Sequence, residues 1–151
     1  MPRLVSAHFG EIDCPDEAVL DFPQGIPAFD EDTRFAVIEP AANAPVVFLQ
    51  SMVHPELCLI TLPVLAIDPG YRLQLAPEDL RALGLADDRQ PEIATEVICL
   101  AVVTIPPDRR PTANLMAPVV IHRHSRRALQ AIQVDSPYSH QHPLPAREEP
   151  C

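Results

Sequence analysis

Residues 96–105 read EVICLAVVTI, the longest apolar run in the chain, and Pro106-Pro107 end it. The run is rich in β-branched residues, which are enriched in strands. It is too short to span a membrane, because a spanning helix needs about 18 apolar residues or more. These residues therefore predict a strand at the centre of a sheet.

On both sides of this run, other short apolar segments are separated by Pro, Gly, Asn and Asp. The segments are Leu4–Phe9, Val19–Phe22, Phe35–Glu39, Val46–Ser51, Leu57–Leu62, Tyr71–Leu75, Asn114–Met116, Val119–His122 and Ala128–Val134. Short strands at this spacing, punctuated by turn residues, favour an all-β sandwich or barrel.

One segment has the features of a helix. Pro77 suits a first helical position, and the acidic residues Glu78 and Asp79 favour the positive amino end. Leu80 and Leu83 form an apolar pair, and Gly84 is a suitable stop. We therefore expect a mainly β fold, a small antiparallel β-barrel-like single domain with one short helix.

The length of 151 residues suits one domain. We expect that domain to cover residues 1–144. Residues 145–151 contain Pro145 and Pro150 and almost no apolar side chains, so we expect a disordered tail there.

The chain is acidic, with a net charge of −10 and 11 basic residues, all of them arginine. Phosphate binding needs clustered basic residues, so neither nucleic acid nor an anionic membrane is an expected direct partner. A basic patch on another protein would be attracted. The alternative is that the charge only keeps the protein soluble.

The cysteines do not form a metal or redox motif. Cys14, Cys58, Cys99 and Cys151 lie far apart and make no CxxC pair. Residues 1–10 lack the apolar segment of a signal peptide. We expect a cytoplasmic protein in which Cys58 and Cys99 are buried thiols.

No pattern indicates catalysis, a metal ion or a cofactor. His122 and His124 share a strand face, but arginines crowd that stretch and oppose a cation. His140 and His142 lie near the expected tail. His54 and Glu56 lack a nucleophile nearby in sequence, and a polar turn between two strands explains them better. Four glycines do not supply a glycine-rich phosphate loop.

Several residues are candidates for contact with a protein partner. Phe22, Ile26, Pro27 and Phe29 lie in a loop whose Gly25 permits a positive φ. Such a loop either plugs the end of a barrel, which we favour, or presents a binding surface. Gln50 and Asn114 interrupt apolar segments. They either pin a loop by hydrogen bonds, which we favour, or contact a partner.

Five motifs, in the same order, make the chain resemble the FliW family over about residues 3–144. The family's F-x-x-G-I-P-G-F loop resembles residues 22–29, although Ala28 replaces a glycine. Its L-Q-S strand end resembles Leu49-Gln50-Ser51, and its D-P-x-Y turn resembles residues 68–71. Its N-L-x-A-P-I-V-I segment resembles residues 114–121. The Y-x-x-x-H-P-L ending resembles residues 138–144.

The resemblance implies a function that composition does not reveal. FliW-like proteins are not enzymes. They bind newly made flagellin in the cytoplasm, and they also bind CsrA, an RNA-binding regulator that represses flagellin synthesis. When flagellin is exported, the freed FliW-like protein sequesters CsrA and translation resumes. The resemblance implies these partners and this partner switch for the present chain.

The sequence is also compatible with a different class of function. Small β-barrels also bind flavins or other ligands in a pocket. Such proteins usually offer basic and hydroxyl side chains to a cofactor phosphate. The one basic cluster in this sequence is Arg123–Arg127.

Overall fold

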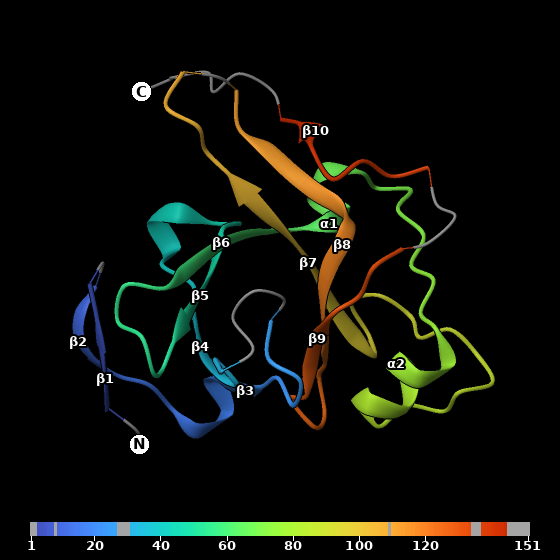
Figure 1. Ribbon diagram of the computed structural model, residues 1–151, viewed down its shortest axis with the longest axis horizontal. Helices are drawn as coiled ribbons and strands as arrows, with labels where there is room; N and C mark the ends of the chain where they lie inside the picture. The colour runs from blue at the N-terminus through green and yellow to red at the C-terminus, as the bar shows by residue number, and fades with distance from the viewer. Residues whose placement is uncertain (1–2, 8, 27–30, 109, 134–136, 145–151) are drawn as a thin grey trace.

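The computed structural model describes residues 3–7, 9–26, 31–108, 110–133 and 137–144 (Figure 1). Its strands are β1 (Arg3–Ser6), β2 (Gly10–Asp13), β3 (Val19–Asp21), β4 (Arg34–Ile38), β5 (Val47–Ser51), β6 (Cys58–Pro63), β7 (Val97–Thr104), β8 (Thr112–His122), β9 (Ala128–Gln130) and β10 (His142–Pro143). Its helices are α1 (Val64–Ile67) and α2 (Pro77–Leu83), with 3-10 turns η1 (Asp16–Ala18) and η2 (Ala41–Asn43).

The strands form a nearly closed antiparallel barrel. The order in the eight-stranded sheet is β10-β8-β7-β6-β5-β4-β3, and β9 pairs with the second half of β8. The sheet comes close to closing on itself where the amide of Asp21 donates to the carbonyl of Arg126 at 3.0 Å. β1 and β2 form a separate hairpin (Figure 1). The mainly β, barrel-like fold expected from the sequence is therefore confirmed.

The strand predicted at residues 96–105 is β7, and it lies between β6 and β8 as expected. Its side chains alternate between two apolar cores. Cys99, Ala101 and Val103 face a core beneath α2, which we call the helix-side core. Leu100 and Val102 face the inside of the barrel, which we call the barrel core. Both faces are apolar in the middle of the strand because each packs against a core, whereas Ile98 near its start is exposed.

The helix-side core joins one face of the barrel to α2. Pro77 opens α2, its side chains Leu80 and Leu83 are fully buried, and Gly84 ends it with a left-handed φ of 83°. The predicted helix is therefore confirmed. Burial of these two leucine side chains contributes about 3–6 kcal/mol to the stability of the fold.

The structure adds elements that the sequence did not indicate. The one-turn helix α1 follows Pro63, so the chain has a second short helix; four residues are too few to show a helical period. β2 and β10 are also new; β2 is largely exposed, and β10 has only two residues. Asn114–Met116 and Val119–His122 merge into β8.

The strand predicted at Tyr71–Leu75 is wrong. Tyr71, Leu73 and Leu75 are buried and the residues between them are exposed, so the segment has the two-residue period of a strand. However, side chains rather than a neighbouring strand bind its amides. The acceptors for the amides of residues 72, 74 and 75 are Tyr138 Oη, Gln133 Oε1 and Gln90 Oε1, at 2.7–2.8 Å.

Within the described residues, neither helix has the length and apolar character to cross a membrane. The expected tail at 145–151 lies outside the described residues.

Candidate functional site

The loop that follows β3 enters the barrel core. Phe22 is fully buried and packs edge-on against Phe35, with ring centroids 5.2 Å apart. Gly25 has a φ of 69°, and its amide donates to the carbonyl of Phe22 at 2.8 Å, which closes the turn. Ile26 is also buried in this core. Phe22 and Ile26 thus plug the barrel, while Pro27 and Phe29 lie outside the described residues.

Gln50, near the end of β5, holds the loop between β5 and β6. It is fully buried, and its Oε1 accepts a hydrogen bond from Ser6 Oγ at 2.7 Å. Its Nε2 lies 3.1–3.3 Å from the carbonyl oxygens of Ser51, His54, Pro55 and Leu57. Two N–H groups are therefore shared among four acceptors. With no exposed surface, Gln50 shapes the loop from inside.

A second polar cluster ties the same loop to the segment before β4. The hydroxyl of Ser51 donates to Oδ1 of Asp32 at 2.5 Å, and Nδ1 of His54 lies 2.8 Å from that oxygen. Burial disfavours ionisation of Asp32, but these two hydrogen bonds outweigh it and lower the pKa of the carboxyl. The hydrogen bond to Asp32 and the charge of Asp32 raise the pKa of His54.

This Asp–Ser–His cluster is not arranged as a hydrolytic triad. In a triad, the serine hydroxyl donates to the histidine, which takes its proton. Here the hydroxyl of Ser51 donates to Asp32 and accepts the amides of Val53 and His54, each at 3.0 Å. His54 is therefore not placed to activate Ser51, and the cluster anchors a loop.

Asn114 has a comparable role in β8. The register between β7 and β8 shifts between Leu100 and Val102, so residues 115–118 form a bulge. Oδ1 of Asn114 accepts the amides of Met116 at 3.1 Å and Ala117 at 3.0 Å. Pro118 has no N–H and fits such an irregularity. The bulge leaves Met116 exposed.

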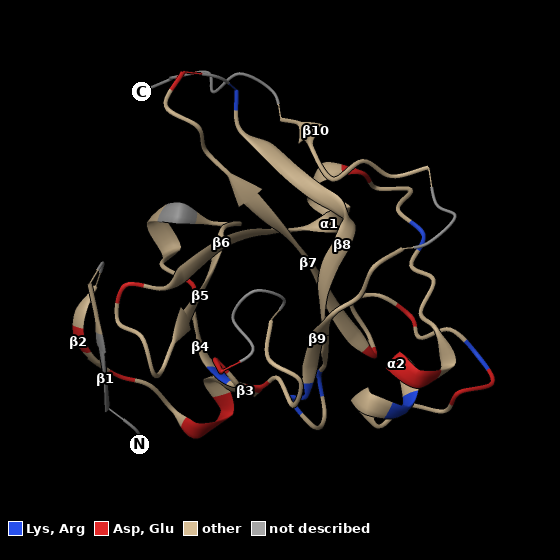
Figure 2. Ribbon diagram, viewed as in Figure 1, with Lys and Arg blue, Asp and Glu red and all other residues tan. Residues whose placement is uncertain are grey.

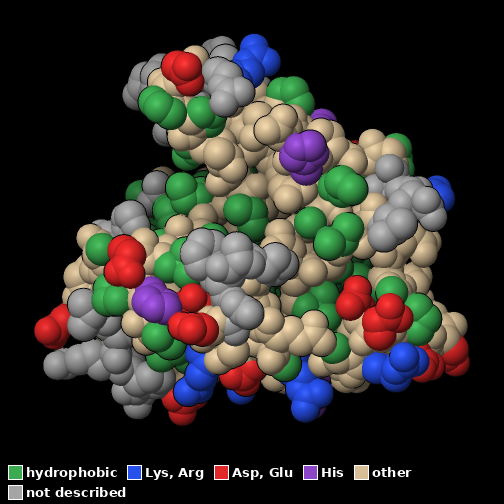
Figure 3. Space-filling model, in the orientation of Figure 1, with side chains coloured by type: hydrophobic (Ala, Val, Ile, Leu, Met, Phe, Trp, Pro, Cys, Tyr) green, Lys and Arg blue, Asp and Glu red, His purple; other side chains and the backbone are tan. Residues whose placement is uncertain are grey.

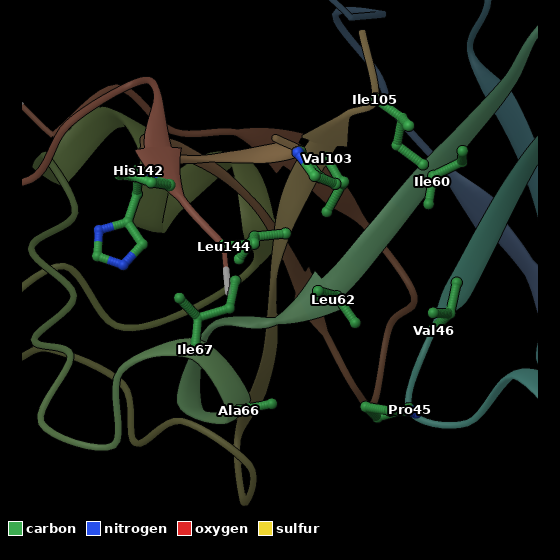
Figure 4. Close-up of a pocket in the computed structure, with 12 residues that line it drawn as sticks. Pro45, Val46, Ile60, Leu62, Ala66, Ile67, Val103, Ile105, His142 and Leu144 are labelled. Carbon is green, nitrogen blue, oxygen red and sulfur yellow. The ribbon is translucent and has the colours of Figure 1, made fainter. Parts of the chain in front are cut away.

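An apolar groove of about 460 Å³ opens at the end of the helix-side core (Figure 4). Its walls come from β6, α1, the end of β7 and the segment around β10. Ile60, Leu62, Ile67 and Leu144 pack against that core but are only half-buried. Their side chains point toward the groove, whereas the imidazole of His142 points away (Figure 4). Ile105, at the mouth, is 59% exposed.

The groove exists because β6 and β7 diverge. They pair only where Thr61–Pro63 meets Leu100–Val102. Before that point β6 pairs with β5 alone, and beyond it β7 pairs with β8 alone. A core that remains open between two diverging strands is suited to receive apolar side chains from another protein.

His122 and His124 are the histidine pair that the sequence places on one strand face. The rings of His122 and His124 are 6.4 Å apart, and Nδ1 of His122 already contacts the carbonyl of Leu83 and the hydroxyl of Ser125. Among the described residues, no group of three potential ligands meets at one point.

Charges are distributed unevenly over the molecule (Figure 2). Acidic residues gather on η1 and on α2 with the loop that follows it. Arginines mark the turn between β8 and β9, at the lower edge of the view (Figure 2). The space-filling view also shows acidic side chains beside a histidine on the left of this face (Figure 3). The acidic surface expected from composition is thus interrupted by one basic turn in the described part of the chain.

The structure brings some of the sequence candidates together and separates others. Phe22 and Ile26 share the barrel core with Leu49, and Gln50 follows directly in β5. Asn114 lies apart, in the β7–β8 pair. Sequence reasoning missed the groove and the contact of Asp32 with His54. The one hint of the groove in the sequence is the family motif at residues 138–144, whose last residue, Leu144, lines the groove.

Comparisons with known proteins agree with the fold. A sequence model of the FliW protein family matches residues 3–144. The flagellar assembly factor FliW of Syntrophomonas wolfei subsp. wolfei is 36% identical over 143 residues, which cover 94% of this chain and 88% of that protein. The flagellar assembly factor FliW of Pseudothermotoga lettingae is 39% identical over 140 residues, which cover 88% and 82%.

A solved structure gives the same result. The crystal structure of a flagellar assembly factor FliW superposes with a TM-score of 0.80 at 26% identity. It covers 94% of this chain and 96% of that one.

Proposed function

Because the chain belongs to the FliW family of flagellar assembly factors, we propose that it acts without catalysis by binding two proteins in the cytoplasm. The first is newly made flagellin, and the second is the translational regulator CsrA. Export of flagellin frees the protein to sequester CsrA, which relieves repression of flagellin translation.

The observation that carries the proposal is the groove. Subunits of a permanent assembly have large apolar interfaces, and these are exposed before assembly. The residues that line the groove are aliphatic apart from His142. The groove therefore suits the apolar interface of an unassembled subunit better than it suits a polar metabolite. We therefore assign flagellin to the groove.

The charge supports the second partner. RNA-binding proteins carry clustered basic residues, and a protein with a net charge of −10 attracts them. An acidic protein bound to CsrA also repels RNA, which is itself anionic. Acidic residues outside the groove are therefore the proposed contacts with CsrA.

The candidate residues named from the sequence enter the proposal in two ways. Phe22, Ile26 and Gln50 are buried, so they act by fixing the barrel end and the loop between β5 and β6. Asn114 acts by holding the bulge that exposes Met116. Pro27 and Phe29 remain proposed direct contacts.

The rival function, a barrel that binds a flavin, has less support. Phe22, Phe35, Leu49 and Leu100 fill the interior where such a ligand would sit. The basic residues Arg123–Arg127 lie on a turn at the surface. An absorbance spectrum of the purified protein distinguishes the two functions, since a flavin absorbs visible light and a partner-binding protein does not.

Isothermal titration of purified flagellin and CsrA tests the proposal. The wild-type protein is expected to bind each partner. Ile105→Ser is expected to weaken flagellin binding by about tenfold, because burial of an aliphatic side chain contributes about 1.5 kcal/mol or more. Ile132→Ser is the matched control, because Ile132 is 58% exposed and lies outside the groove. If the wild type binds neither partner, the proposed function is wrong. If Ile105→Ser binds flagellin normally, the groove is not the contact.

A further inference from the structure

Three arginines lie within five residues at the turn between β8 and β9. We call residues 123–127 the arginine turn; it contains Arg123, Arg126 and Arg127. Arg123 and Arg127 are exposed, and Arg126 is half-buried. The chain has no lysine and 21 acidic residues, so this cluster runs against the overall charge of the protein.

Hydrogen bonds hold the backbone of the turn. The amide of Arg126 donates to the carbonyl of His122, and the amide of His122 donates to the carbonyl of Arg127, both at 2.8 Å. The hydroxyl of Ser125 accepts the amide of Arg127 at 3.2 Å. The carbonyl of Arg126 accepts the amide of Asp21, at the point where the barrel comes close to closing. The arginine turn is therefore held in place before any partner arrives.

Arg126 occupies a backbone conformation that does not suit it. Its φ is 61°, in the left-handed region, where glycine is the least costly residue and a long side chain is uncommon. The backbone gains nothing from arginine over glycine at this place. A non-glycine residue that adopts a positive φ without stabilising the fold indicates a functional constraint.

Within the part of the chain that the structure describes, no carboxylate forms an ion pair with a guanidinium group of the arginine turn. Among the residues described, Arg34, Arg81 and Arg89 each pair with a carboxylate. Nη1 of Arg123 donates instead to the carbonyl of Ala94, at 2.6 Å. The nearby acids Asp21 and Glu96 are already bound to Arg34 and Arg89. Unpaired arginines on a fixed turn are suited to bind carboxylates of another molecule.

We propose that the arginine turn is a docking site for an acidic segment of flagellin. The inference rests on the proposed function, which supplies the partner. CsrA binds RNA and presents basic groups, which the arginine turn repels, so flagellin is the partner left to supply carboxylates. The groove is lined by the segment around β10, which pairs with the start of β8 at Thr112 and Ala113, whereas the turn follows the end of β8. Effects at the two places should therefore add.

The test is titration of flagellin with wild type, Arg126→Gly and Arg127→Gln at about 0.01 M and about 0.15 M salt. Each variant is expected to weaken binding by about three- to fivefold at low salt, the range for one exposed charge contact, and by less at high salt. Arg126→Gly is also expected to keep or raise the melting temperature, because glycine accepts this φ. Loss of binding with a retained fold is an outcome that a structural role does not produce.

Controls separate the possible failures. Arg72→Gln removes an exposed arginine elsewhere and should bind flagellin as the wild type does. If both turn variants also bind as the wild type does, the inference is wrong while the proposed function stands. If they weaken CsrA instead, the assignment to flagellin is overturned. If the wild type does not bind flagellin at all, the proposed function fails and the inference fails with it.

Discussion

Replacement of Gln50 by alanine should destabilise the protein more than most single changes. The amide is fully buried, accepts one hydrogen bond from Ser6 and donates two N–H groups to backbone carbonyls. Three net hydrogen bonds at about 1 kcal/mol each amount to about 3 kcal/mol. Three of the four carbonyls keep an amide partner, at residues 54, 55 and 57, which limits the further cost.

The measurements are urea unfolding and thermal unfolding, each monitored by circular dichroism. In a domain of this size about 1 kcal/mol corresponds to roughly 2–4 °C, so the melting temperature should fall by about 6–12 °C. Gln50→Glu should cost more than Gln50→Ala, because it places a charged acceptor against the same carbonyls. Gln141→Ala, at an exposed position, should change stability by less than about 0.5 kcal/mol. A loss below about 1 kcal/mol in Gln50→Ala would refute the view that this side chain holds the loop.

Three further predictions concern the core, the bulge and pH. Val103→Asp should lower the free energy of unfolding by about 4 kcal/mol or more, because it buries an unpaired charge in the helix-side core. Thr104→Asp, on the exposed side of the same strand, should change it little. Equal urea midpoints for the two variants would contradict the assignment of Val103 to the core. Asn114→Ala should cost about 1–2 kcal/mol, since two amides of the bulge lose their acceptor; an unchanged urea midpoint would show that the bulge holds itself. Asp32 raises the pKa of His54, so protonated His54 stabilises the folded protein. This stabilisation is fully present below about pH 6.5 and is lost as the pH rises through the raised pKa. The gap in melting temperature between wild type and His54→Gln should shrink from pH 6 to pH 9, and a constant gap would exclude the ion pair.

The sequence was sufficient for features that depend on local periodicity. β7 and α2 were found because an apolar run and a capped apolar pair are visible in a few consecutive residues. Tyr71–Leu75 shows the limit of this approach: its pattern is that of a strand, but distant side chains bind its amides. A two-residue apolar period shows which side chains are buried, but it does not show which groups accept the hydrogen bonds of the backbone amides.

The candidate site was harder to predict because its contacts join residues far apart in the chain. Asp32 meets His54 across 22 positions, and no spacing rule connects them. The groove depends on where β6 and β7 diverge, and the apolar residues along it are indistinguishable in sequence from ordinary core. Gln50 and Asn114 were recognised as unusual, because a polar residue inside an apolar segment must find hydrogen bonds.

The partner switch is tested most directly by release of RNA. Labelled leader RNA from the flagellin message is bound to purified CsrA, and its fluorescence anisotropy is followed while this protein and then flagellin are added. The hypothesis predicts that the protein lowers the anisotropy to that of free RNA and that excess flagellin restores it, because binding of the two partners is linked reciprocally. RNA that stays on CsrA at saturating protein, or release that flagellin does not reverse, would contradict it.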